Sequence, residues 1–180
     1  MKYAEEALRL EPDRPACMSF LIGVLGLLRE FERAAELSRR LLFNYPNNPK
    51  RWFGLAEELL HDMKRPSEAL DAYRKAVDLE PSNIAFQPGL IKGLSAAGQH
   101  DDAIEYAEHL LEDPSRDLGT TRRAHIYEDL GHAFVRAKRW TEAEQAYEHA
   151  LSLEPTNDPN HRGRVESQLR KLDEFLSHKK

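Results

Sequence analysis

Four prolines divide this chain at a nearly constant interval, and that interval limits the folds open to it. Pro12, Pro46 and Pro81 lie 34 and 35 residues apart, and Pro155 follows Pro81 by 74 residues, which is two intervals of 34 plus six extra residues. Proline stops a helix because it lacks a backbone N–H and biases the residue before it away from helical angles. A period of this length indicates a helical repeat whose units end at these prolines.

Within each unit the large and small residues recur in one order. The segments 51–81 and 127–155 show it most clearly, each with two apolar stripes at i, i+3, i+4 and i+7 spacing around a polar turn such as AKRW at 137–140. That periodicity predicts a helical hairpin per unit. Small side chains are expected where the two helix axes approach closely, and large ones beside them. In the last unit the small set is Gly131, Ala143 and Ala150, and the large set is Tyr127, Phe134 and Tyr147.

The pattern resembles the tetratricopeptide repeat, whose W-x2-L-G-x2-Y, A-x3-F and closing P signature is almost fully met by residues 124–157. Residues 49–83 match nearly as well, with one extra residue that we expect in the turn around Lys64-Arg65-Pro66. Residues 84–117 keep the small and aliphatic positions but carry Gln87 where the large aromatic belongs. The resemblance covers nearly the whole chain and implies an all-α fold, a right-handed α-solenoid of helix-turn-helix repeats with a C-terminal capping helix.

The implied organisation is the second helix of an incomplete repeat over 1–12, repeats over 15–48, 49–83, 84–117 and 118–157, and a capping helix over 158–180. The insertion before the last repeat, 115–123, is expected to be a hinge, a contact loop or a tolerated connection. The first complete repeat is expected to expose apolar surface, either because the array continues upstream or because its open end docks onto something.

Composition excludes several classes of partner. With 26 basic and 31 acidic residues the net charge is -5, which argues against a surface that neutralises phosphates or an anionic membrane. The apolar stretch 16–28 is shorter than the roughly 20 residues that cross a bilayer. The N-terminus lacks the basic start and apolar run of a signal peptide. The single cysteine, Cys17, is expected to be a buried, inert thiol. We expect a cytoplasmic protein without nucleic-acid binding or membrane insertion.

One polar cluster invites a search for a metal site. His125, Glu128, Asp129 and His132 share one side of a predicted helix. The two histidines are two turns apart, roughly 10 Å, which is too far for one ion unless the side chains bend together. Paired cysteines, a His-Glu-x-x-His pair, a Gly-rich phosphate loop and a Gly-x-Ser-x-Gly elbow are absent from the sequence. We therefore expect no catalytic residues, no metal, no cofactor and no enzymatic activity.

The first helices of successive tetratricopeptide units line a concave groove, so the resemblance implies which residues face it. They are Ala16, Ser19, Phe20, Gly23 and Leu27, then Lys50, Phe53, Gly54, Glu57 and Leu60, then Ala85, Pro88, Gly89, Lys92 and Ser95, and last His125, Glu128, Asp129, His132 and Arg136. Small residues at Ser19, Gly23, Gly54, Ala85 and Gly89 replace the family's two-carboxylate clamp, so chaperone-tail binding is not expected.

The predicted peptide-binding residues are Phe20, Leu27, Phe53, Glu57, Leu60, Lys92, His125, Glu128, Asp129, His132 and Arg136. Phe53 and Leu60 are expected to be surplus to the core, because Trp52, Leu55 and Leu59 already fill the inward stripe. Phe20 and Leu27 either line the groove or pack on neighbouring helices.

Three functions follow. The first is a non-catalytic scaffold, monomeric, that binds a peptide or helical segment of a partner protein. The second is the repeat arm of a larger enzyme or of a secretion or assembly complex. The third is a structural module that self-associates end to end through its uncapped N-terminal end.

Overall fold

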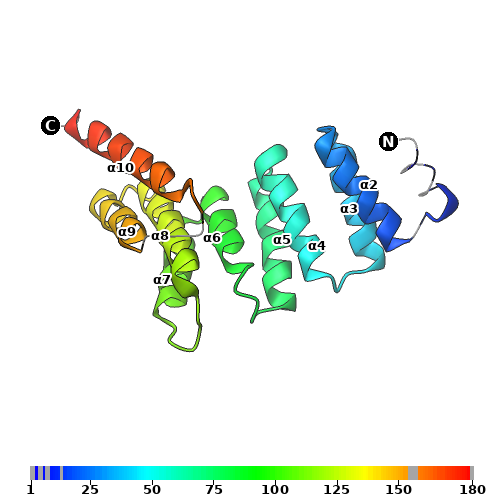
Figure 1. Cartoon of the computed structure of the whole chain (residues 1–180), viewed down its shortest axis with the longest axis horizontal. Coiled ribbons are helices and arrows are strands. Elements are labelled where there is room, and N and C mark those ends of the chain that lie inside the picture. Colours follow the sequence, from blue (N-terminus) through cyan, green and yellow to red (C-terminus); the bar gives the residue numbers. More distant parts are fainter. Residues whose placement is uncertain (1–2, 4–5, 7–8, 13, 154–157, 179–180) are drawn as a thin grey trace. The chain divides into compact units, whose positions relative to one another are not determined.

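The computed structural model describes residues 3, 6, 9–12, 14–153 and 158–178, and every regular element among them is helical. Two compact units divide the chain, Met1–Gly89 and Leu90–Lys180. The elements are α2 (Pro15–Leu27), α3 (Phe31–Asn44), α4 (Pro49–Glu57), the π-helix η1 (Glu58–Asp62), α5 (Pro66–Leu79), α6 (Gln87–Ala96), α7 (His100–Glu112), α8 (Gly119–Arg136), α9 (Trp140–Ser152) and α10 (His161–Ser177), as Figure 1 shows. No helix within the described ranges is long and apolar enough to span a bilayer.

In the first unit, consecutive helices pack on one another: α2 on α3, α3 on α4, and α4 on α5. The helix α2 contributes four buried side chains at the spacing that the sequence predicts for an inward stripe. Together with α3 they form one core cluster: Met18, Leu21, Ile22, Leu25, Ala34, Leu37 and Leu41. Prolines at the start of α2, α4 and α5 fit there because the first turn of a helix has no use for their missing N–H.

Each hairpin turns over three residues, and the middle residue is left-handed. Arg29, Lys64 and Lys138 have φ angles of 60°, 56° and 62°, and Gly98 has 85°. A left-handed residue after a helix lets the next N–H reach back to the last free carbonyls. The four turns therefore share one backbone solution, although only one of them uses the glycine that this conformation favours.

Hydrogen bonds show how the turns close. Glu30 N donates to Leu25 O at 2.9 Å and Arg139 N donates to Phe134 O at 2.9 Å, five residues back in both hairpins. In the second hairpin Arg65 N donates to Leu59 O at 2.8 Å, which is six residues back. The extra residue of this repeat is thus accommodated in η1, at the end of the first helix. Our expectation that it lengthens the turn was wrong, because a π-turn absorbs one residue while leaving the turn unchanged.

Gln87 replaces the missing aromatic in an unexpected way. Trp52 Nε1 donates to Pro46 O at 2.8 Å, and Gln87 Nε2 donates to Pro81 O at 3.1 Å, each to a carbonyl six residues earlier. Gln87 is 1% exposed, so its amide makes the same tie between a first helix and the preceding connection. The adjacent Phe86, 6% exposed, supplies a buried ring. The hydrogen bond is conserved between the two hairpins even though the side chain differs.

In the second unit, α8 packs on α7 and α9, and α10 packs on α9. Part of the predicted insertion is helical, because α8 already begins at Gly119. Leu118 is 3% exposed, and Arg123 Nη1 donates to Leu111 O at 3.2 Å. The hydrogen bond fastens the connection to the end of α7.

The predicted capping stripe on α10 is present, with Val165 and Leu172 buried and Leu169 and Leu176 half-buried. Pro155 and half of the residues of the incomplete repeat predicted over 1–12 lie outside the described residues.

Candidate interaction surfaces

Phe53, the central residue of the predicted groove, is half-buried in an aromatic cluster. Its ring packs edge-on against Tyr73 at 5.4 Å between centroids and stacks on Phe86 at 5.2 Å. Tyr73 is fully buried. The expectation that Phe53 is surplus to the core was therefore wrong: one part of its ring completes the core and only the remainder is available to a partner.

Gly89 explains how these rings fit together. A Cβ at position 89 would lie 2.5 Å from Phe53 Cε2 and 2.6 Å from Tyr73 Cε1. Gly89 is buried, and so is Ser95, so neither lines an open groove as the resemblance implied. Gly54 makes room in a similar manner, because its missing Cβ would meet Arg51 Nη2 at 2.6 Å.

Along α4 and η1, polar groups follow Phe53. Glu57 accepts a hydrogen bond from the Tyr73 hydroxyl, and its other oxygen lies 3.5 Å from His61 Nε2. Leu60 is half-buried and His61 is exposed. This face of the first unit, which we call the α4 face, consists of Phe53, Glu57, Leu60 and His61. It places an apolar group, a carboxylate and a second apolar group along a single helix.

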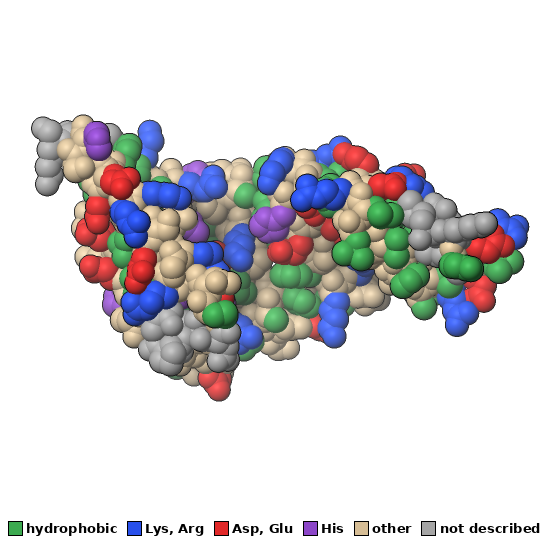
Figure 2. Space-filling view, turned by 45° about the horizontal axis from the view of Figure 1, so that its top comes forward, with side chains coloured by type: hydrophobic (Ala, Val, Ile, Leu, Met, Phe, Trp, Pro, Cys, Tyr) green, Lys and Arg blue, Asp and Glu red, His purple; other side chains and the backbone are tan. Residues whose placement is uncertain are grey.

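Phe20 and Leu27, for which groove lining and packing on neighbouring helices were both possible, are exposed on α2. They are 64% and 87% exposed. Figure 2 shows hydrophobic side chains gathered on the right of the view, where α2 lies in Figure 1. No neighbouring helix among the described residues covers these two side chains, so the first complete repeat does present apolar surface.

Two acidic residues of the predicted groove in the second unit, Glu128 and Asp129, are buried. Glu128, which is 7% exposed, receives hydrogen bonds from Arg164 Nε at 3.2 Å and Nη2 at 3.1 Å. His161 is fully buried with its Nε2 3.5 Å from Glu128. Asp129 is also 7% exposed. The expectation that Glu128 and Asp129 line an open groove was wrong: both are buried, and the terminal helix brings Arg164 and His161 onto Glu128.

Two histidines at the same place stay partly accessible. His125 has its ring 5.1 Å from that of His161 and its Nε2 3.6 Å from Asp158. Burial lowers the pKa of His125, and the nearby His161 adds to this effect. The His132 ring lies edge-on to Tyr147 at 5.6 Å, and burial lowers the pKa of His132 against the opposing field of Glu128. Both shifts favour the neutral form of the ring.

Charged side chains also shift the pKa values of neighbouring groups in the second unit. Hydrogen bonds from the Arg164 side chain and from the Asn160 backbone lower the pKa of Asp158. Hydrogen bonds to Glu128 and then to Asp158 raise the pKa of Arg164. Burial raises the pKa of the Tyr147 hydroxyl, with Glu128 and Asp129 adding to the effect. The described residues include no group of three or more His, Cys, Asp or Glu side chains arranged to hold a metal ion. The two remaining charged residues of the predicted groove, Lys92 and Arg136, are exposed.

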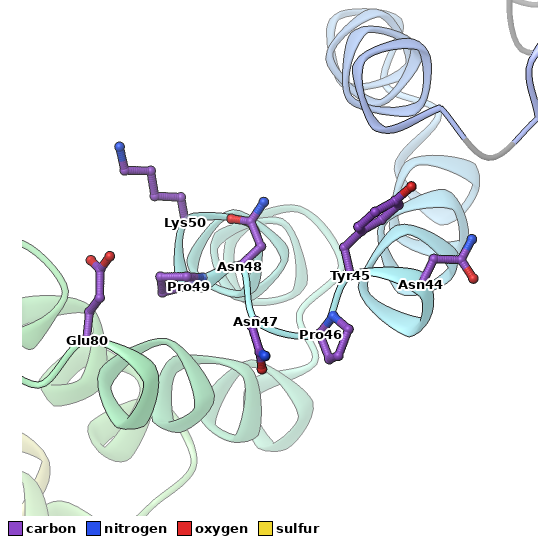
Figure 3. A pocket seen from close by; sticks show the side chains of 8 residues that line it. All are labelled: Asn44, Tyr45, Pro46, Asn47, Asn48, Pro49, Lys50 and Glu80. Carbon is purple, nitrogen blue, oxygen red and sulfur yellow. The ribbon is translucent and has the colours of Figure 1, made fainter.

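A polar pocket of about 580 Å³ lies at the connection between α3 and α4 (Figure 3). Its lining is Asn44, Tyr45, Pro46, Asn47, Asn48, Pro49, Lys50 and Glu80. Several of these groups already have structural partners: Asn48 Oδ1 accepts from Arg51 N at 3.1 Å, and Glu80 accepts from Asn83 Nδ2 at 2.7 Å. The pocket is thus the hollow left by a capped helix start.

Sequence reasoning missed two contributors to the α4 face, Tyr73 and Phe86. Tyr73 lies within the repeating pattern of residues 51–81, and its hydroxyl also donates to Glu57 and so positions that carboxylate. Phe86 stands one residue before a helix that begins at Gln87, outside the repeating pattern. The signal that could have found it is the absence of an aromatic at position 87, which leaves space for a ring nearby.

Comparison with known proteins identifies the repeats. Tetratricopeptide repeat models match residues 28–84 and 90–154. The small glutamine-rich tetratricopeptide repeat-containing protein 2 of Mycosarcoma maydis is 32% identical over 91 residues, which make up 50% of this chain and 24% of that protein. Human tetratricopeptide repeat protein 21B is 26% identical over 111 residues, 62% of this chain and 8% of that protein. The chain thus spans less than a quarter of the length of these two relatives.

Solved structures agree in fold. YrrB superimposes with a TM-score of 0.71 at 17% identity, covering 92% of this chain and 81% of YrrB. MamA superimposes with a TM-score of 0.69 at 18% identity, covering 85% of this chain and 80% of MamA. The expected all-α solenoid class is confirmed. The described helical hairpins, the two matched repeat models and these related folds together show that the chain belongs to the tetratricopeptide repeat family.

Proposed function

We propose that this chain is a non-catalytic protein-interaction module that binds a segment of a partner protein along the α4 face. The observation that carries the proposal is the half-buried ring of Phe53, held between Tyr73 and Phe86. A ring fixed in this way loses little conformational freedom on binding, and rigid aromatic anchors are typical of the residues that dominate interface energies.

The chemistry of the α4 face suggests the kind of segment that fits. An apolar side chain would pack on the open part of Phe53, and a second one on Leu60, while a donor or basic group would lie near Glu57. The Tyr73 hydroxyl and His61 already orient that carboxylate. A charged contact at such a rim sets orientation and salt dependence more than affinity.

The family supports an interaction role. YrrB is described as a tetratricopeptide repeat protein with an unusual peptide-binding site. The single cysteine, a free and half-buried thiol, suits a reducing compartment, and we propose the cytoplasm as the place of action.

The test is selection of peptides from a random display library on the parent protein, followed by affinity measurements on variants. Phe53→Leu keeps an apolar side chain in the core but removes the ring that a partner would contact. We expect this change to weaken the binding of the selected peptides at least tenfold, about 1.4 kcal/mol. Phe43→Leu is the matched control, because Phe43 is 87% exposed on α3 and lies outside the α4 face.

Thermal unfolding of each variant separates binding from folding. Peptides that bind parent and Phe53→Leu equally well would refute the α4 face as the site. Loss of binding in Phe43→Leu alone would move the site to α3.

A further inference from the structure

The helix α2 has no polar face. Its sequence, PACMSFLIGVLGL, contains no charged residue. Met18, Leu21, Ile22 and Leu25 are buried against α3, while the opposite side is exposed. A surface helix normally carries polar residues on its outer side, and a helix that is apolar all round is normally covered on both sides. No described residue covers the outer side of α2.

The exposed side of α2 alternates small and large residues along one line. Ala16, Phe20, Gly23 and Leu27 follow one another at intervals of four, three and four residues, the spacing of a single helix face. All four are exposed. No atom lies within 4 Å of the place where a Cβ on Gly23 would stand, so an open notch lies next to Phe20.

The alternation of small and large residues on α2 is complementary to that of a second copy of α2 running in the opposite direction. In an antiparallel pair of α2 helices related by a two-fold axis, residues whose numbers add up to 43 lie at the same level. Phe20 is then level with Gly23 of the second copy, and Ala16 is level with Leu27. Each level combines one large and one small side chain, which lets two helices approach and interdigitate. A parallel pair would instead set Phe20 against Phe20 and leave Gly23 facing Gly23.

We propose that α2 is a homodimerisation surface, on which α2 of a second copy packs antiparallel about a two-fold axis. This goes beyond the proposed function, since it involves α2 and none of the residues of the α4 face. The occupant is a second copy because the size order matches its own reverse and because α2 offers no charge that would recognise a charged partner.

The charges that flank α2 are partly compensated. Arg14 stands just before α2 and forms an ion pair with Glu11 at 2.9 Å, and Glu30 follows Arg29 at the other end. Because the contact itself is apolar, association should change little as salt is raised. A dimer held by opposite charges would weaken under the same conditions.

The affinity follows from the size of the surface. A helix of 13 residues is about 20 Å long, and a single helix face is smaller than the roughly 800 Å² per partner of a standard interface. We therefore expect association in the micromolar range.

The experiment is sedimentation equilibrium of the full chain from low micromolar to near-millimolar concentration, at low and high salt. Phe20→Ala should raise the dimer dissociation constant at least about tenfold because it removes the large member of a level. Gly23→Phe should do the same, since it puts two rings at one level. The double variant Phe20→Ala/Gly23→Phe exchanges the members of the level and should restore association close to that of the parent.

The control is Phe43→Ala, which removes an equally exposed ring from α3 and should leave association unchanged. Circular dichroism melts of all variants monitor the fold, and a variant that melts earlier than its matched control is replaced by the milder Phe20→Leu. A parent that stays monomeric throughout, including one that binds another protein through Phe20, would overturn the proposal. So would a double variant that associates no better than either single one.

Discussion

At the scale of single residues, the packing of the repeats requires glycine at positions where a larger residue would not fit. Gly131 lies so close to Tyr147 that a Cβ would be 2.5 Å from Tyr147 Cε1 and 2.7 Å from Cδ1. Tyr147 is 1% exposed and cannot move into solvent without emptying the core. The glycine of the repeat signature is thus fixed by the tyrosine of the facing helix.

Gly131→Ala should destabilise the protein by about 1–3 kcal/mol, because overpacking the contact with Tyr147 outweighs the better helix propensity of alanine. Gly163→Ala is the matched control, since nothing lies within 4 Å of a Cβ there. We expect that change on α10 to stabilise by up to about 1 kcal/mol. Urea unfolding of both variants measures the difference. Equal stabilisation by both would show that Tyr147 does not pack on Gly131 in solution.

At the scale of elements, backbone conformation affects the stability of the turns, and ion pairs of one arginine hold the last helix in place. Lys138 holds a φ angle of 62° that costs a side-chain-bearing residue energy, while Gly98 holds 85° without that cost. On α10, Arg164 bridges Glu128 of α8 and Asp158, with 2.7 Å between its Nη1 and Asp158 Oδ2.

Exchanging turn residues should move stability in opposite directions. Lys138→Gly should stabilise by about 0.5–1 kcal/mol, because relief of the left-handed conformation exceeds the added entropy of the unfolded chain. Gly98→Ala should destabilise by about 1 kcal/mol for the converse reason. Thermal melts of the two variants report the changes. A destabilising Lys138→Gly would indicate that the lysine makes a contact worth more than the backbone relief.

Removing the α10 ion pair should loosen that helix. Arg164→Gln leaves Glu128 buried with weaker partners, and we expect a loss of about 1–3 kcal/mol, moderated because Arg164 itself is partly solvated. Arg162→Gln is the control: its pair with Glu166, on the same helix, has side chains 58% and 46% exposed. That change should stay within about 0.5 kcal/mol. Amide hydrogen exchange along α10 measures both. Equal protection in the two variants would refute an anchoring role for Glu128.

At the scale of the whole molecule, the chain forms two compact units, and the pH dependence of unfolding reports on the second one. The folded-state pKa values of His125 and His132 lie below the ordinary value of 6.5. Between those values and 6.5 the unfolded chain binds more protons than the folded chain, so stability rises with pH in that window. The stability associated with the neutral rings is complete above pH 6.5 and is lost as pH falls through the folded-state values.

The measurement is the free energy of unfolding in urea between pH 7.5 and 5, above the range where most carboxylates titrate. The parent should lose stability on acidification, and His132→Gln should lose less because one of the two rings is gone. A parent whose stability is constant over this range, or a double His125→Gln/His132→Gln variant as acid-sensitive as the parent, would contradict the pKa directions.

The sequence by itself determined the repeating helical hairpins, because their cause is local and periodic. The proline interval, the i, i+3, i+4, i+7 stripes and the small residues at Gly131 and Ala143 each act within a single unit. For Phe20 and Leu27 the sequence left two alternatives open, and the structure shows both exposed, while Met18, Leu21, Ile22 and Leu25 fill the inward face of α2.

Only the tertiary structure decided what depends on contacts between distant segments. Arg164 reaches Glu128 across 36 positions of sequence, and Phe53 stacks on Phe86. Gly89 leaves the space that the rings of Phe53 and Tyr73 occupy. The periodicity of one helix cannot reveal which outward residues a later helix will cover. The extra residue of the second repeat is a similar case. The sequence does not distinguish a longer turn from a π-helix, and the structure places the residue in η1, where Leu59 is buried.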